Sequence, residues 1–116
     1  MKRRASSRAA AAAFTAAAPV FAALGDQTRL RLVARLGTEG PLSITRLTAG
    51  TDVSRQAVTK HLLVLADAGL ARSVPQGRER LWQLQPEPLD EVRRSLDLIS
   101  QRWDTSLARL KAAVEE

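Results

Sequence analysis

The sequence contains no cysteine and only one histidine, His61. Without thiols the chain cannot form disulfide bonds, thiolate metal sites or thiol redox switches, and it has no need of an oxidising compartment. A lone histidine has no second histidine or cysteine to join it around a metal ion. We therefore expect no metal site and no cofactor.

Aromatic residues are scarce, with two Phe, two Trp and no Tyr among 116 residues. The core must therefore be aliphatic, and the abundance of Leu and Ala favours helices. The length suits one domain. Signals of catalysis are absent too, because we find no paired carboxylates, no nucleophile with a base and no Gly-rich phosphate loop. We expect the protein not to be an enzyme.

Long, strongly apolar runs are also missing, so we expect no membrane span. Residues 1–24 superficially resemble a secretory signal, with a basic start and an Ala-rich middle. Alanine is a poor substitute for the leucines of such signals, and Thr15 and Pro19 interrupt the run. We expect a cytoplasmic protein in which residues 1–17 form a basic, Ala-rich, flexible arm that is partly helical.

Charge is unevenly distributed along the chain. Residues 1–85 hold 13 Lys or Arg against 5 Asp or Glu, whereas residues 86–116 hold 5 against 7. A basic body followed by an acidic segment indicates a polyanionic partner for the first part only. The arm's Lys2, Arg3, Arg4 and Arg8 could lie along such a partner, although a solubilising tail is the simpler interpretation.

Helix signals follow the arm. Val20, Phe21 and Leu24 form a short apolar helical face before Gly25. Asp26 is a suitable N-cap for a second helix that we expect to end at Gly37. The inward residues of that helix are expected at Leu30, Val33 and Leu36.

Two capped helices come next, separated by a tight turn. Ser43 caps a brief helix that Gly50 ends, and Ser54 caps a longer one that continues to about residue 68. A short helix, a four-residue turn and a longer helix are typical of a helix-turn-helix. Residues 38–43 before it are expected to be a loop or a two-residue strand.

The longer helix, residues 54–68, divides its residues by chemistry. At 100° per residue the inward side holds Val58, His61, Leu62, Leu65 and Ala68, so His61 is expected to be a buried, hydrogen-bonded structural residue. The outward residues near the N-terminal end are Ser54, Arg55, Gln56, Thr59 and Lys60. Such side chains can read base edges in a major groove, although a solvated helix face would look the same. Leu63 also points outward, and we expect only partial cover by the following segment.

That segment alternates as two strands around Gly77 and predicts a wing over residues 72–84. Its arginines, Arg72, Arg78 and Arg80, are candidates for contacts with phosphates or the minor groove, the alternative being a charged hairpin in solvent. Ser43 and Thr45 begin the preceding helix, where backbone N–H groups can hold a phosphate. Their capping role would equally explain them. Trp82 is expected to pack the wing onto the body.

The C-terminal segment predicts a long helix over about residues 88–114. Its apolar residues recur in steps of three and four: Leu89, Val92, Leu96, Ile99, Trp103, Leu107, Leu110 and Val114. This stripe is nearly a coiled-coil seam and is too long for so small a body to bury. It needs a partner.

Three segments together resemble the ArsR family of winged-helix transcriptional repressors: "GDQTRLRLV", "SRQAVTKHL" and "GRERLW". The similarity covers about residues 20–110. It implies a mainly α fold, a winged helix-turn-helix with a two-stranded β wing and a long C-terminal dimerisation helix. It also implies a homodimer, joined through the first and last helices, that binds an inverted-repeat operator in double-stranded DNA. Expected interface residues are Val20, Phe21, Leu24, Leu96, Ile99, Trp103, Leu107 and Leu110.

By the same resemblance, the residues that read DNA are Ser54, Arg55, Gln56, Thr59 and Lys60, with Arg78 as the wing contact. The sensing residues depart from the family's metal-responsive members, because "SITRLT" lacks Cys and the last helix lacks His. The remaining carboxylates, Asp90, Glu91, Asp97 and Asp104, are poor transition-metal ligands alone. A non-metal branch with an unidentified small-molecule effector is expected. The alternative is a protein-interaction module.

Overall fold

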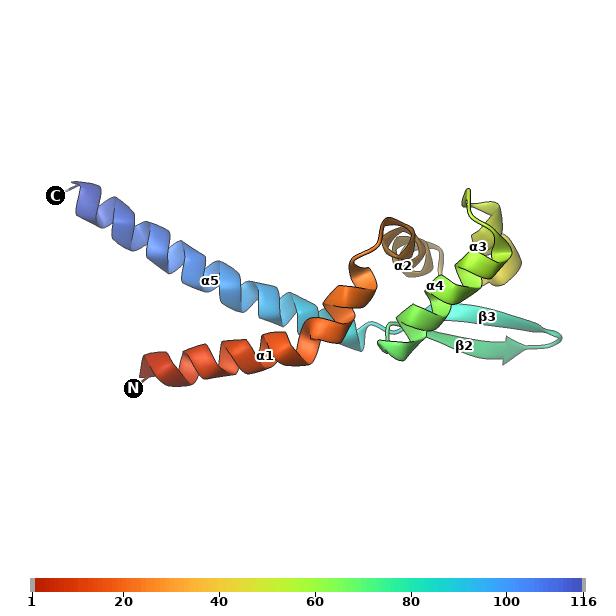
Figure 1. Cartoon of the computed structure of the whole chain (residues 1–116), viewed down its shortest axis with the longest axis horizontal. Coiled ribbons are helices and arrows are strands. Elements are labelled where there is room, and N and C mark those ends of the chain that lie inside the picture. Colours follow the sequence, from red (N-terminus) through yellow and green to blue (C-terminus); the bar gives the residue numbers. More distant parts are fainter. Residues whose placement is uncertain (1, 116) are drawn as a thin grey trace.

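The computed structural model describes residues 2–115, except the side chains of residues 2–7 and 10. The side chains of Lys2, Arg3 and Arg4 in the expected arm lie outside this description. Two long helices, α1 (Lys2–Leu24) and α5 (Glu87–Glu115), extend together from a smaller body, and the wing projects from the opposite end (Figure 1). The molecule is a winged helix-turn-helix with a long C-terminal helix, as the sequence predicts.

Helix α1 runs without interruption through the expected arm and into the body. The boundary that we expected after residue 17 therefore does not coincide with the end of an element. Alanine favours helix more than any other residue, which explains the continuity. Pro19, which lies inside α1, lacks an N–H group and crowds the preceding turn. Figure 1 shows that α1 is bent. Ala17, Val20 and Ala23 are buried, so the second half of α1 belongs to the body.

Helix α2 (Gln27–Glu39) begins where the sequence predicts and ends later. The Asp26 carboxylate accepts a hydrogen bond from the backbone N–H of Arg29 at 3.0 Å, which confirms the N-cap. The predicted stop at Gly37 is wrong, because the helix continues to Gly40, whose φ is 82°. A Cβ at Gly37 would lie 3.4 Å from the Leu84 side chain, so the glycine allows the sheet to approach closely.

The inward face of α2 also differs from the prediction. Leu32 and Leu36 are buried, whereas Leu30 is 50% exposed. The leucines of this segment are at positions 30, 32 and 36, and both Leu30 with Val33 and Leu32 with Leu36 have helical spacing, so the periodicity alone did not determine which leucines face the core.

The helix-turn-helix is confirmed. Helix α3 (Ile44–Ala49) follows the Ser43 cap and leads into Gly50. Helix α4 (Arg55–Asp67) follows the Ser54 cap and ends before Gly69, which has a φ of 76°. Val53 packs against the cluster that contains the buried Val58, as expected for the residue before a cap.

The wing is part of a three-stranded antiparallel sheet in the order β1–β3–β2. Strand β1 (Leu42–Ser43) pairs with β3 (Glu79–Leu84), which in turn pairs with β2 (Ala71–Gln76). The sequence allowed for the two-residue strand but predicted a two-stranded wing. The third strand forms because Leu42 pairs with Trp82, whose 9% exposure confirms that it packs the wing onto the body.

The core is aliphatic, as the composition indicates. Its most completely buried side chains come from α2, α3, α4 and the start of the wing: Leu32, Leu47, Val58, Leu62, Leu65 and Leu70. Leucines from both helices of the helix-turn-helix thereby hold α4 against the body. This packing orients the outward face of α4.

The buried residues of helix α5 lie in its first turns, where it packs against α1. Val92 and Ser95 are buried there, and the Ser95 hydroxyl donates to the Glu91 carbonyl at 3.0 Å while it lies 3.5 Å from the Ala13 carbonyl. Beyond Ser95 every residue of α5 up to Glu115 is exposed. None of the helices in the described part has the length and hydropathy that crossing a bilayer requires.

Candidate nucleic-acid interface

The first turns of α4 present polar side chains to solvent. Ser54, Arg55, Gln56 and Lys60 are exposed, and the opposite face is buried. The Ser54 oxygen accepts from the Ala57 N–H at 3.1 Å, so its own hydroxyl hydrogen is available to a ligand. The helix therefore has the predicted division into an inner apolar and an outer polar face.

Thr59 differs from the other outward residues of α4. It is half-buried, and its hydroxyl donates to the Arg55 carbonyl at 2.8 Å. Its hydrogen is thus used within the helix, which leaves oxygen lone pairs and a methyl group for any external contact.

The start of α3 combines a cap with an exposed threonine. The Ser43 oxygen accepts from the Arg46 N–H at 3.2 Å, and Thr45 is exposed. The capping role expected of Ser43 is confirmed. A phosphate contact by either residue stays a prediction.

The three wing arginines have different surroundings. The Arg80 Nε donates to the Ser73 hydroxyl at 2.8 Å. Arg72 donates to the Gln83 side chain at 3.2 and 2.7 Å, once that amide is oriented with its oxygen toward the guanidinium. Arg78, in the tight turn at Gly77, is exposed and has no polar partner among the groups that the structure describes.

Strand pairing separates Arg72 from Arg80. Arg72 pairs with Gln83, and Arg80 pairs with Pro75. Paired residues share a face of the sheet, and faces alternate along each strand, so positions 72 and 75 lie on opposite faces. A ligand that lies against one face of the sheet can therefore contact Arg72 or Arg80 but not both.

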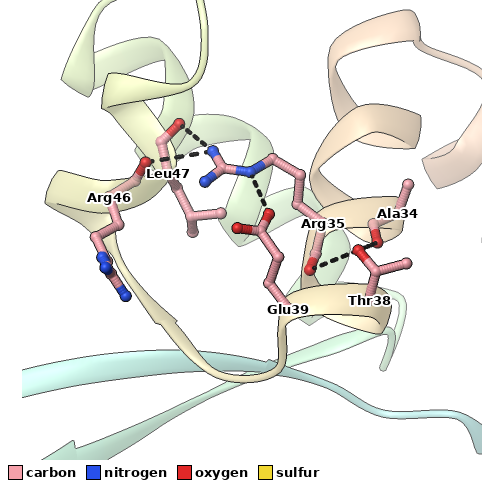
Figure 2. A network of polar contacts seen from close by, with 6 residues as sticks. All are labelled: Ala34, Arg35, Thr38, Glu39, Arg46 and Leu47. Atoms are coloured by element: carbon pink, nitrogen blue, oxygen red, sulfur yellow. Dashed lines mark hydrogen bonds and ion pairs between the residues drawn. The ribbon is translucent and has the colours of Figure 1, made fainter.

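Arg35 connects α2 to the end of α3, a contact that the sequence did not predict (Figure 2). Its Nε donates to the Glu39 carboxylate at 2.8 Å, and its Nη1 donates to the carbonyls of Arg46 and Leu47 at 3.2 and 3.1 Å. The hydrogen bond from Arg35 to the Glu39 carboxylate holds the pKa of Glu39 below its ordinary value. The guanidinium thus binds carbonyls near the C-terminal end of α3. The only signal in the sequence was the four-residue spacing of Arg35 and Glu39.

A second arginine, Arg29, joins three helices. Its Nε donates to the Ala23 carbonyl at 2.6 Å and its Nη2 to the Ala22 carbonyl at 3.3 Å, which caps the end of α1. Its Nη1 lies 3.3 Å from Nδ1 of His61 on α4. Helix α4 is therefore linked to α1 by polar contacts as well as by packing.

His61 occupies the structural position that the sequence predicts, although it is half-buried rather than buried. Its Nδ1 lies 3.8 Å from the Asp26 carboxylate. The Arg29 N–H, followed by the charges of His61 and Arg29, lowers the pKa of Asp26. Within the described residues no three histidine or carboxylate side chains gather closely enough to bind a metal ion.

The residues expected at a subunit interface fall into two groups. On α1, Val20 is only 5% exposed within a single chain, and Phe21 and Leu24 are half-buried against the core. The Phe21 ring stacks on Phe14 with centroids 6.1 Å apart. On α5 all the expected residues are exposed: Leu96, Ile99, Trp103, Leu107 and Leu110. Leu98, which the predicted stripe did not include, is exposed as well. The surface left for a partner is therefore mostly on α5.

A cavity of about 270 Å³ lies beside the turn between α3 and α4. It is lined by residues from α2 and from that turn, including Thr28, Arg31, Thr51 and Asp52. The sequence did not single out these residues, and the expected small-molecule effector stays a prediction.

Known proteins share this fold and sequence. A family model described as a helix-turn-helix domain matches residues 24–74. The chain is 42% identical over 88 residues to the HTH-type transcriptional regulator Rv2034 of Mycobacterium tuberculosis, a match that covers 76% of this chain and 81% of that protein. An ArsR-like transcriptional regulator from Rhodococcus sp. RHA1 superposes with a TM-score of 0.73 and 37% identity, over 86% of this chain and 93% of the other.

A more distant structure is that of Mb0332 from Mycobacterium bovis, a homodimeric winged helix-turn-helix DNA-binding domain. It is 22% identical with a TM-score of 0.60, over 81% of this chain and 83% of the other, and it shares the fold. The relationship to Rv2034 and to the Rhodococcus regulator extends beyond the helix-turn-helix, since each match covers most of both chains. The chain belongs to the ArsR family of winged helix-turn-helix transcriptional regulators.

Proposed function

We propose that a homodimer of this chain binds an inverted repeat in double-stranded DNA and represses transcription from it. The recognition helix, residues 54–68, would enter the major groove, and the wing, residues 72–84, would lie against the backbone or minor groove. One observation carries this proposal: the exposed polar first turns of α4 lie opposite a completely buried face. The body fixes the helix while leaving these side chains free to contact bases.

The chemistry of these side chains suggests their roles. Arg55 can donate two hydrogen bonds to guanine, and Gln56 can pair with adenine. Lys60 suits either a base or a phosphate, and Ser54 can donate its hydroxyl hydrogen to a phosphate. Thr59, whose hydrogen is held by Arg55, would act as an acceptor or through its methyl group.

In the wing, Arg78 is the proposed principal contact. Its position in the turn, its exposure and its lack of a partner within the described chain support this role. Arg72 and Arg80 already have partners on the sheet and lie on opposite faces, so we assign them secondary contacts.

Dimerisation would occur mainly through α5. Its exposed stripe from Leu96 to Leu110 is too apolar to be left in water, and the homodimeric state of Mb0332 supports a homodimer here. A two-fold axis would set the recognition helices about 34 Å apart, one turn of DNA. Since the operator lies with the chromosome, we expect the dimer to act in the cytoplasm.

The test is to select bound sequences from a random duplex pool and then measure the affinity of variants for the selected operator. Arg55→Ala and Gln56→Ala should each weaken binding by about 5- to 150-fold per half-site, the loss of one bidentate contact from each subunit. Arg93→Ala, which removes an exposed arginine from α5, is the matched control and should bind normally. Unchanged affinity of both α4 variants would refute the proposed reading face of α4, which consists of Ser54, Arg55, Gln56, Thr59 and Lys60. Failure to bind any duplex at low salt would favour a protein-interaction module instead.

A further inference from the structure

One exposed side chain of α4 is not explained by packing. Leu63 is 52% exposed, so it is only partly covered, as the sequence predicts. A single exposed leucine is common on protein surfaces, so exposure alone says nothing about function. Its position on the recognition helix is more informative.

Leu63 lies on the same face of α4 as the proposed reading residues. It follows Gln56 by seven positions, Thr59 by four and Lys60 by three. Residues at i, i+3, i+4 and i+7 share one side of a helix, and recognition helices use this same spacing to reach bases. The helix rises about 10 Å from Gln56 to Leu63, which corresponds to roughly three base pairs.

We propose that Leu63 reads a thymine in each half-site by packing against its C5-methyl group, an inference that rests on the proposed DNA binding. A leucine cannot donate or accept hydrogen bonds, so it cannot distinguish the polar edges of bases. Among the base edges in the major groove, only thymine carries an apolar group. Contact would remove both the leucine and the methyl group from water, which favours thymine over cytosine at that position.

The experiment removes the methyl group alone. In the operator selected with the wild-type protein, each thymine of the half-site is replaced in turn by deoxyuridine, symmetrically in both half-sites. At one position wild-type affinity should fall by about fourfold per half-site, the effect of one buried methyl group. Leu63→Ala should bind more weakly than wild type and should not respond to deoxyuridine at that position.

Leu30→Ala is the matched control, because Leu30 is an equally exposed leucine that lies on α2, outside the reading face. This variant should keep the wild-type response to deoxyuridine. Thermal unfolding of both variants checks that neither change disturbs the fold.

The outcomes separate this inference from the proposed function. If the protein binds its operator but no deoxyuridine substitution changes affinity, the role of Leu63 is wrong and DNA binding stands. The same holds if Leu63→Ala responds to deoxyuridine as the wild type does, or if the selected half-site contains no thymine. If no duplex is selected at all, the proposed function falls, and the role of Leu63 falls with it.

Discussion

The guanidinium of Arg35 covers the Cα of Gly50, so that a Cβ at position 50 would overlap Nη1 and lie 2.8 Å from Cζ. The same guanidinium donates to the carbonyls of Arg46 and Leu47 near the end of α3 (Figure 2). The backbone conformation of Gly50, with φ −91° and ψ 9°, is one that residues other than glycine also adopt. The arginine, rather than the turn, therefore occupies the space that a side chain at position 50 would need.

This relationship predicts that the effect of Gly50→Ala changes sign with its background. In the wild type the new methyl group displaces the guanidinium, so the loss of its hydrogen bonds should cost about 1 kcal/mol. In Arg35→Ala the space is empty, and the alanine should stabilise the fold by about 0.5 kcal/mol because it restricts the unfolded chain. Urea unfolding of the four proteins at one protein concentration measures both values.

The prediction is contradicted if Gly50→Ala lowers the free energy of unfolding equally in the wild type and in Arg35→Ala. That result would show that the turn itself, and not Arg35, excludes a side chain at position 50. Arg31→Ala is a suitable control for the loss of a nearby exposed arginine on α2.

Local signals predicted the helix-turn-helix well. Ser43 and Ser54 each accept a hydrogen bond from an N–H three residues later, so the cap and its partner lie within one short segment of sequence. Capping depends on few residues and on little else, which is why the bounds of α3 and α4 could be predicted closely.

The features that sequence did not reveal depend on distant residues. Gly37 reads as a helix stop but lies within α2, where its lack of a side chain admits Leu84 from the sheet. Val20, which we predict at the interface, is already only 5% exposed in a single chain because α1 packs on the body. Arg29 contacts His61, which lies 32 positions away in the sequence, and no local pattern predicts such a pair. Tertiary packing decided each of these cases.

Asp26 should make stability depend on pH in the acid range. The Arg29 N–H, together with the nearby His61 and Arg29 charges, lowers the pKa of Asp26 below 3.8. A carboxylate with a depressed folded pKa stabilises the fold above its unfolded pKa, and this contribution is lost as pH falls through the folded pKa. Asp26→Asn keeps a good N-cap but removes the charge.

The urea midpoints of wild type and Asp26→Asn should therefore converge as the pH falls below 3.8 and separate above it, with the wild type more stable. Measuring both proteins between about pH 2.5 and 6 isolates Asp26, since the other carboxylates titrate in both. A constant difference across this range would contradict the assignment.

Trp103 should be an anchor of the proposed dimer. It is 63% exposed in a single chain and lies in the middle of the apolar stripe of α5. Large aromatic side chains at the centre of interfaces commonly carry about 2 kcal/mol or more, so Trp103→Ala should raise the dimer dissociation constant by at least about 30-fold. Sedimentation equilibrium measures this constant directly.

Thr105→Ala is the control for that change, because Thr105 is exposed on α5 outside the stripe and its hydroxyl bonds only within the helix, to Gln101. It should leave the dissociation constant unchanged. A wild-type chain that sediments as a monomer at every concentration would rule out the interface.

A phosphate contact by Arg78 should contribute to the salt dependence of DNA binding. Each phosphate contact contributes about 0.9 to the slope of log affinity against log salt, so losing one contact per subunit should reduce the slope by about 1.8 in a dimer. Arg78→Ala should weaken binding to the operator and to unrelated duplex alike, since phosphates carry no sequence information. Arg55→Ala should instead reduce the preference for the operator.

The matched comparison for Arg78 is Arg80→Ala, two residues away on the same hairpin. The Arg80 Nε donates to Ser73, whereas Arg78 has no partner within the described chain, so removing Arg80 should change the slope less. Equal slopes for both variants would mean that the wing acts through its net charge, because only a contact made by one specific residue distinguishes two arginines so close together. An unchanged slope for Arg78→Ala would remove the wing from the interface and leave binding to α4 alone.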